Sequence, residues 1–115
     1  MKDYNGEIEY KEKKYKLVFD FNVMSTIQEE YGSFGKWADL VDGENDVEPN
    51  VKAVIFGYTE MLNEGIEIEN EKNGTNIKPF ATKEVGRMIS EIGLRKAVNS
   101  LNQTVIESTK NEEKN

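Results

Sequence analysis

Cysteine and histidine are both absent from this chain of 115 residues. Without cysteine the chain forms no disulfide, has no thiol nucleophile and offers no sulfur ligand for zinc or an iron–sulfur cluster. Without histidine it lacks the side chain that most often acts as a general base or binds a metal ion near neutral pH. We therefore expect that the protein uses no cofactor and no metal.

Long apolar runs are also missing, since none approaches the roughly 20 residues that a membrane-spanning helix requires. The first ten residues, MKDYNGEIEY, lack the apolar core of a signal peptide. We therefore expect a cytoplasmic protein that does not bind a membrane.

Positive charge is scarce, because 15 lysine and arginine residues stand against 22 aspartate and glutamate residues and give a net charge of −7. Contacts to nucleic-acid phosphates require clustered lysine and arginine. The one basic run, Lys11–Lys16, is interrupted by Glu12 and Tyr15. Nucleic acid is therefore not an expected partner.

Apolar residues are few for a globular domain, since hydrophobic residues make up 37% of the chain and charged residues 32%. Either some segments are unfolded, or a partner completes part of the core. The length favours one domain, which we place at residues 1–107. Residues 108–115 carry no apolar side chain and are predicted to form a disordered tail.

Two alternating stretches near the start of the chain predict a β-hairpin. Ile8 and Tyr10 share one side of the stretch Gly6–Tyr10, and apolar residues recur at every second position of Tyr15–Phe21. The charged stretch Lys11–Lys14 would join the two strands as a loop.

Two short helices should follow the hairpin. The first has apolar residues at helical spacing, with Asn22 or Ser25 as its N-cap and Gly32 as its stop. The second begins after Ser33 and carries Trp37, the only tryptophan.

A longer helix is predicted from Pro49 to about Asn63, with Gly65 ending it. Gly57 lies inside this helix, where a close approach of another helix would explain a glycine. The polar residues 66–79 favour a small second hairpin and a long loop about equally.

Helical spacing returns in two stretches, Lys83–Ile92 after a cap at Thr82, and Leu94 to about Glu107 after Gly93. The predicted fold class is α+β, mainly α, with an N-terminal β-hairpin followed by about four to five helices.

Candidate catalytic and metal sites are weak. The acidic residues from Asp42 to Glu48 alternate like the start of a calcium loop, with Glu44 and Asp46 between them. Val47 and Ala53 stand where that loop needs glycine and glutamate, so a solvated loop is favoured. The glycines near Ser33 lack the spacing of a phosphate-binding loop. We therefore do not expect an enzyme.

The aromatic and apolar stripes of the helices are the more informative candidates. They either form the core or contact a partner, because aromatic side chains often anchor interfaces. Candidate partner-binding residues are Phe34, Trp37, Tyr58, Met61, Leu101 and Val105, and candidate self-association residues are Tyr10 and Tyr15.

The order of these elements, with the stretch FDFNVMSTIQEEYGS and a tryptophan-bearing helix after it, resembles the tail assembly chaperones of long-tailed, siphovirus-type bacteriophages and of gene-transfer agents. The matching features are Leu17–Phe21, Asn22, Ile27, Glu29, Tyr31, Gly32 and Trp37. A looser similarity extends through Val51–Leu62 and Val85–Ile106.

The resemblance implies a non-enzymatic chaperone that keeps the tape measure protein soluble and helps to recruit the tail tube protein. It also implies a homo-oligomer in the host bacterial cytoplasm that is absent from the mature virion. The alternatives are a phage tail structural component or another small protein-binding or regulatory module. An enzyme would need two acids of raised pKa in a deep pocket.

Overall fold

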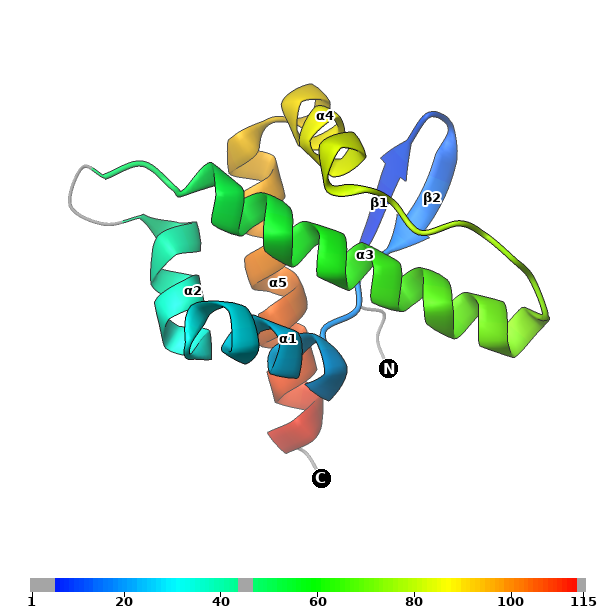
Figure 1. The fold of residues 1–115 in the computed structure, drawn as a ribbon, viewed down its shortest axis with the longest axis horizontal. Coiled ribbons are helices and arrows are strands. Elements are labelled where there is room, and N and C mark those ends of the chain that lie inside the picture. The colour runs from blue at the N-terminus through cyan, green and yellow to red at the C-terminus, as the bar shows by residue number, and fades with distance from the viewer. Residues whose placement is uncertain (1–5, 44–46, 114–115) are drawn as a thin grey trace.

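The computed structural model describes residues 6–43 and 47–113. In this part of the chain an antiparallel hairpin is followed by five helices, which confirms the predicted α+β, mainly α class (Figure 1). The elements are β1 (Glu7–Tyr10), β2 (Lys13–Lys16), α1 (Phe21–Tyr31), α2 (Phe34–Asp42), α3 (Val51–Asn73), α4 (Thr82–Ile92) and α5 (Leu94–Glu113). The expectations for residues 1–5, for part of the acidic loop (44–46) and for residues 114–115 lie outside the described residues.

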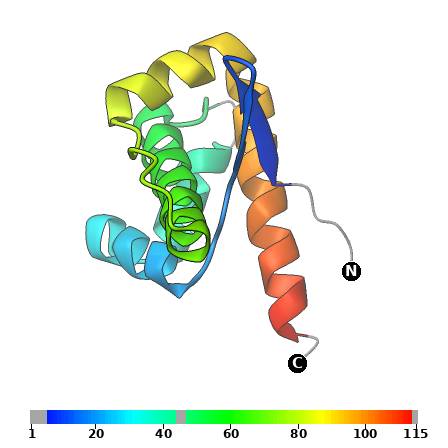
Figure 2. The same cartoon turned by 90° about the vertical axis from the view of Figure 1, so that its right-hand side faces the viewer.

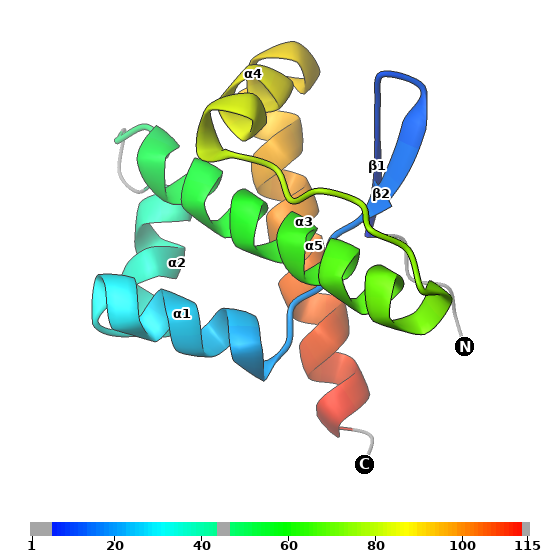
Figure 3. The same cartoon turned by 45° about the vertical axis from the view of Figure 1, so that its right-hand side comes forward.

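Helix α3 is the central element, since it packs against β2, α1, α2, α4 and α5. It crosses in front of α5 in Figure 1, and Figure 3 shows the hairpin and the α1–α2 pair on opposite sides of α5. Figure 2 shows α4 spanning from α3 to the start of α5. The core cluster takes buried side chains from β1, from the segment after β2 and from every helix.

The closest contact of α3 is with the indole of Trp37, which is 1% exposed. The indole Nε1 donates a hydrogen bond to the carbonyl of Ala53 at 2.9 Å. A Cβ on Gly57 would overlap Cζ2 of the indole and lie 3.0 Å from its Cε2. Gly57 therefore sits where a second helix approaches closely, as the sequence predicts.

Gly65 lies inside α3 and does not end it, so that prediction was wrong. A Cβ there would lie 2.6 Å from the carbonyl oxygen of Lys16. The missing side chain lets the chain after β2 rest on the helix, where Val18 N–H donates to the carbonyl of Met61 at 3.1 Å. The glycine thus serves a long-range contact rather than a helix stop.

The second strand covers Lys13–Lys16 instead of the predicted Tyr15–Phe21. It begins earlier because the turn between the two strands has only two residues. Lys11 and Glu12 both have positive φ values, 52° and 66°, as two-residue hairpin turns of type I′ require. The register pairs Glu7 with Lys16 and Glu9 with Lys14, and the rest are Ile8 with Tyr15 and Tyr10 with Lys13. Opposite charges therefore face each other across the strands, which stabilises the pairing.

The N-cap of α1 is Asp20 rather than Asn22 or Ser25, because its side chain accepts from Val23 N at 3.1 Å. Phe21 thus starts a helix and is 72% exposed, instead of ending a strand. The predictions for the next boundary were right, since Gly32 follows α1 with φ 91° and Ser33 caps α2.

Residues 66–79 form neither a second hairpin nor one long loop, because α3 continues to Asn73 and Gly74 is its left-handed C-cap. The chain then returns along the helix. The Asn70 side chain donates to the carbonyl of Ile77 and accepts from its N–H. Asn63 forms the same pair of bonds with Phe80.

Helices α4 and α5 match the predicted pattern, with two differences at their ends. The N-cap of α4 is Ala81, whose N–H donates to the Glu84 carboxylate at 3.0 Å, so Thr82 is not the cap. Helix α5 continues to Glu113, past the predicted boundary at 107, and the Ser108 hydroxyl donates to the carbonyl of Phe19 at 2.8 Å.

The contact between Trp37 and Gly57 predicts that G57A lowers the free energy of unfolding by about 1–3 kcal/mol, the usual cost of overpacking a core. Chemical denaturation measures the change. G86A is the matched control in α4, because a Cβ there meets only Ile55 Cδ1 at 3.5 Å, an ordinary contact. Alanine should be neutral or stabilising at that position. A G57A variant as stable as G86A would contradict the described packing.

Candidate functional site

Four of the predicted partner-binding residues belong to the core. Tyr58, Met61 and Leu101 are 0% exposed and Trp37 is 1% exposed, so a partner does not reach them in this fold. Burial raises the pKa of Tyr58 to about 12, and the Ser100 hydroxyl opposes the shift. We therefore reassign these four side chains from partner binding to the core.

The other predicted contact residues are half-buried and pack against that core. The ring of Phe34 lies 5.7 Å from Phe19, and the ring of Tyr15 lies 5.1 Å from Phe80. Tyr10 and Val105 have the same partial exposure. These four side chains cover the core and leave one edge in solvent, so their proposed roles stay predictions.

A groove between α3 and α4 is the strongest candidate site. It has a volume of about 740 Å³, and residues of α1 and α5 complete its lining, which consists of these residues: Glu30, Tyr31, Val51, Lys52, Ile55, Phe56, Thr82, Lys83, Gly86, Arg87, Ile89, Ser90 and Leu94. We call it the α3–α4 groove. Its volume lies in the range of about 300–1,000 Å³ that is typical of ligand sites.

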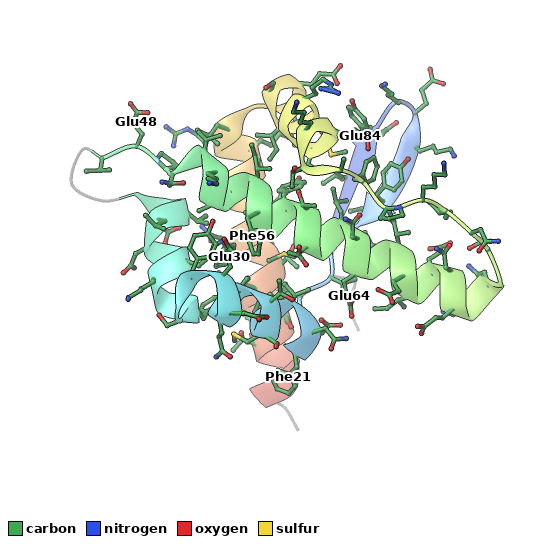
Figure 4. All side chains as sticks on the ribbon, viewed as in Figure 1. Phe21, Glu30, Glu48, Phe56, Glu64 and Glu84 are labelled. Carbon is green, nitrogen blue, oxygen red and sulfur yellow. The ribbon has the colours of Figure 1, made fainter. Side chains whose placement is uncertain are left out.

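The floor of the α3–α4 groove is apolar. Val51 is 48% exposed, and Ile55 and Phe56 are half-buried. The Phe56 ring packs edge-on against Tyr31 at 5.4 Å, and Figure 4 shows Phe56 beside Glu30 at the end of α1. Burial, with a smaller contribution from Glu30, raises the pKa of Tyr31, so its phenol stays neutral at physiological pH.

The rim of the groove is positive although the chain is acidic. Lys52, Lys83 and Arg87 are all exposed, and Glu30 is the only acid among the lining residues. None of the three cations forms an ion pair with a described residue. Three cations without an ion-pair partner among the described residues, placed around an apolar floor, favour an acidic, partly apolar ligand.

Sequence reasoning predicted the helix that carries Val51 and Ile55 but singled out neither Phe56 nor the three cations. One signal was available, since Lys83 and Arg87 stand four residues apart and therefore share a helix face. Lys52 is on another helix, and only the fold brings it to the same groove.

A second hollow of about 830 Å³ is lined by α2 and by residues 47–50. It borders residues 44–46, which are outside the described part of the chain, and we build no site on it.

A carboxylate pair, Asp20 and Glu64, lies where α1 meets α3 and lines neither hollow. Glu64 Oε2 accepts from Asn22 Nδ2 at 3.1 Å, and Figure 4 labels Glu64 on α3. The contact with Asp20, then burial, raises the pKa of Glu64. Among residues 6–43 and 47–113 no three His, Cys, Asp or Glu side chains gather to hold a metal ion.

Comparisons of the chain with protein-family models, with curated proteins and with solved structures found no match. Within the described residues, no helix combines the length and the apolar character that crossing a bilayer requires.

The raised pKa of Glu64 predicts that E64Q is more stable than the natural chain at neutral pH. A carboxyl group whose pKa is raised by folding stabilises the fold below its unfolded-state pKa, and this contribution is lost as the pH rises through the folded-state pKa. Removing the charge should gain a few tenths of a kcal/mol at pH 7 for a pair this exposed. The gain should vanish as the pH falls to about 4, where the natural side chain is also protonated.

Thermal unfolding of both chains across that pH range measures the difference. E71Q removes an exposed charge from the same helix and should change stability little at any pH. Equal curves for E64Q and the natural chain at pH 7 would show that the two carboxylates do not repel each other.

Proposed function

We propose that this chain is a bacteriophage tail assembly chaperone that binds the tape measure protein without catalysing a reaction. The observation that carries the proposal is the α3–α4 groove, an open apolar surface on a chain of net charge −7. The resemblance of residues 17–37 to this chaperone family supports the same assignment.

The physical argument starts from the client. A tape measure protein is a long helical chain whose apolar faces favour aggregation before the tail tube surrounds it. An acidic protein with an apolar groove can cover such faces while its charge keeps the complex in solution. Contacts that are weak one at a time bind strongly when many subunits line up along one client.

The remaining parts of the proposal follow from that role. The chaperone would act in the host bacterial cytoplasm, help to bring the tail tube protein to the client, and leave before the virion is complete. The absence of an enzyme role is part of the proposal, and it is supported by the position of Asp20 and Glu64 outside both hollows.

Co-expression with a bacteriophage tape measure protein should increase the soluble fraction of that protein, and the two should co-purify. V51D should reduce the rescue, because it places a charge on the apolar floor at a residue that is 48% exposed. Aspartate at the first position of a helix is also compatible with the helix dipole, so the fold should persist.

I106D is the matched control, since Ile106 is 50% exposed on α5 and does not line the groove. It should rescue the client as well as the natural chain does. A client that stays insoluble with the natural chain would contradict the proposed function. Finding the chain in finished particles would favour a tail structural component instead.

Self-association is a second part of the proposal, with Tyr10 and Tyr15 on the hairpin as candidate contacts. The sheet in the described residues has two strands only, so each strand has an edge without a strand neighbour. Such edges pair readily with a strand of another chain. Light scattering over a wide concentration range should show oligomers, and a strict monomer at the highest concentration would contradict this part.

A further inference from the structure

We propose that the α3–α4 groove binds a short acidic amphipathic helix of a partner protein. Apolar side chains of this helix would fill the floor, and its carboxylates would meet Lys52, Lys83 and Arg87 on the rim. That the helix comes from a client rests on the proposed function, whereas the chemistry of the ligand rests on the groove alone.

The shape of the groove favours a helix over an extended strand. Its walls are helices, and none of its lining residues lies on β1 or β2, so it offers no strand edge for pairing. The lining part of α4 runs from Thr82 to Ser90, about 12 Å at 1.5 Å per residue. Two turns of a partner helix span about 11 Å, which places apolar residues i, i+3 or i+4, and i+7 along the floor.

The positive charges around the groove favour an acidic partner helix over a basic one. Lys83 and Arg87 stand one turn apart on α4, and Lys52 stands on α3 at the other wall. Carboxylates on both sides of an apolar stripe would therefore find a cation at each wall. A basic helix would instead place its charges beside three cations and only one acid, Glu30.

A second copy of this chain is a poorer occupant. Its exposed acidic helix is the end of α3, where Glu67, Glu69 and Glu71 surround Ile68, which is 42% exposed. The positions one turn from Ile68 are Glu64, Gly65, Glu71 and Lys72. That helix end has no apolar stripe to fill the floor.

The test uses the full chain and three labelled synthetic helical peptides, with binding followed by fluorescence anisotropy. The first has leucines at helical spacing flanked by glutamates, the second has lysine in place of every glutamate, and the third is a scramble of the first. The first should bind about tenfold more tightly than the second, because its glutamates form screened ion pairs with the three cations. The scrambled peptide should not bind.

K83E/R87E should reverse the preference between the two charged peptides, because both positions are exposed on the rim and the fold does not depend on them. K72E/K78E makes the same charge change at the C-terminal end of α3 and in the segment after it, outside the groove lining, and should leave both affinities unchanged. Circular dichroism should show the same helix content for all three chains.

The proposal is overturned by equal binding of the acidic and basic peptides, by no binding of either, or by an equal effect of the two double variants. It is also overturned if K83E/R87E abolishes self-association while peptide binding persists, since the groove would then be occupied by a second copy. Peptide binding without rescue of a tape measure protein would remove the proposed function alone, and rescue without peptide binding would remove this inference alone.

Discussion

The fold depends on two places where α3 has no side chain. At Gly57 the helix admits the indole of Trp37, and at Gly65 it admits the backbone carbonyl of Lys16. Each glycine costs a helix about 1 kcal/mol relative to alanine, and the close contacts offset that cost by burying the largest side chain of the protein and pairing its indole N–H. The chain is rich in charged residues and poor in large apolar ones. Its small core therefore depends on elements that pack closely against α3.

Signals from neighbouring residues in the sequence correctly predicted a helix boundary that depends only on those neighbours. The boundary between α1 and α2 follows from a glycine stop and a serine cap, and both stand in the structure as expected. Gly65 was misassigned because its role is set by a strand far away in the sequence, and a glycine inside a helix has the same local signature as one that ends it. The hairpin was predicted, but its turn was placed over four residues instead of two, because Lys11 and Glu12 adopt positive φ without the Asn or Gly that normally marks such a turn.

The candidate site was harder to predict for a related reason. Periodicity shows which residues share a helix face, but it does not show which of two apolar faces is inside. Trp37 and Tyr58 were predicted contacts because aromatic side chains often anchor interfaces, but both are buried in the core, where large apolar side chains contribute most. The apolar residues that line the groove at the start of α3 are the exposed Val51 and the half-buried Ile55 and Phe56. Their place in a candidate site is visible only in the folded structure, which brings cations from two helices around them.

The α3–α4 groove is open because the segment that follows α3 is hydrogen-bonded to only one part of that helix. Asn63 and Asn70 are seven residues apart, about 10.5 Å along a helix. Their partners Phe80 and Ile77 are three residues apart, about 10 Å in an extended chain. The two amides therefore hold the returning segment in register over the second half of α3 only. Helix α4 then crosses the first half of α3, with Gly86 at the crossing. The apolar surface of α3 beyond this crossing stays uncovered. Two asparagines with no contact to the groove thus fix the position of its wall.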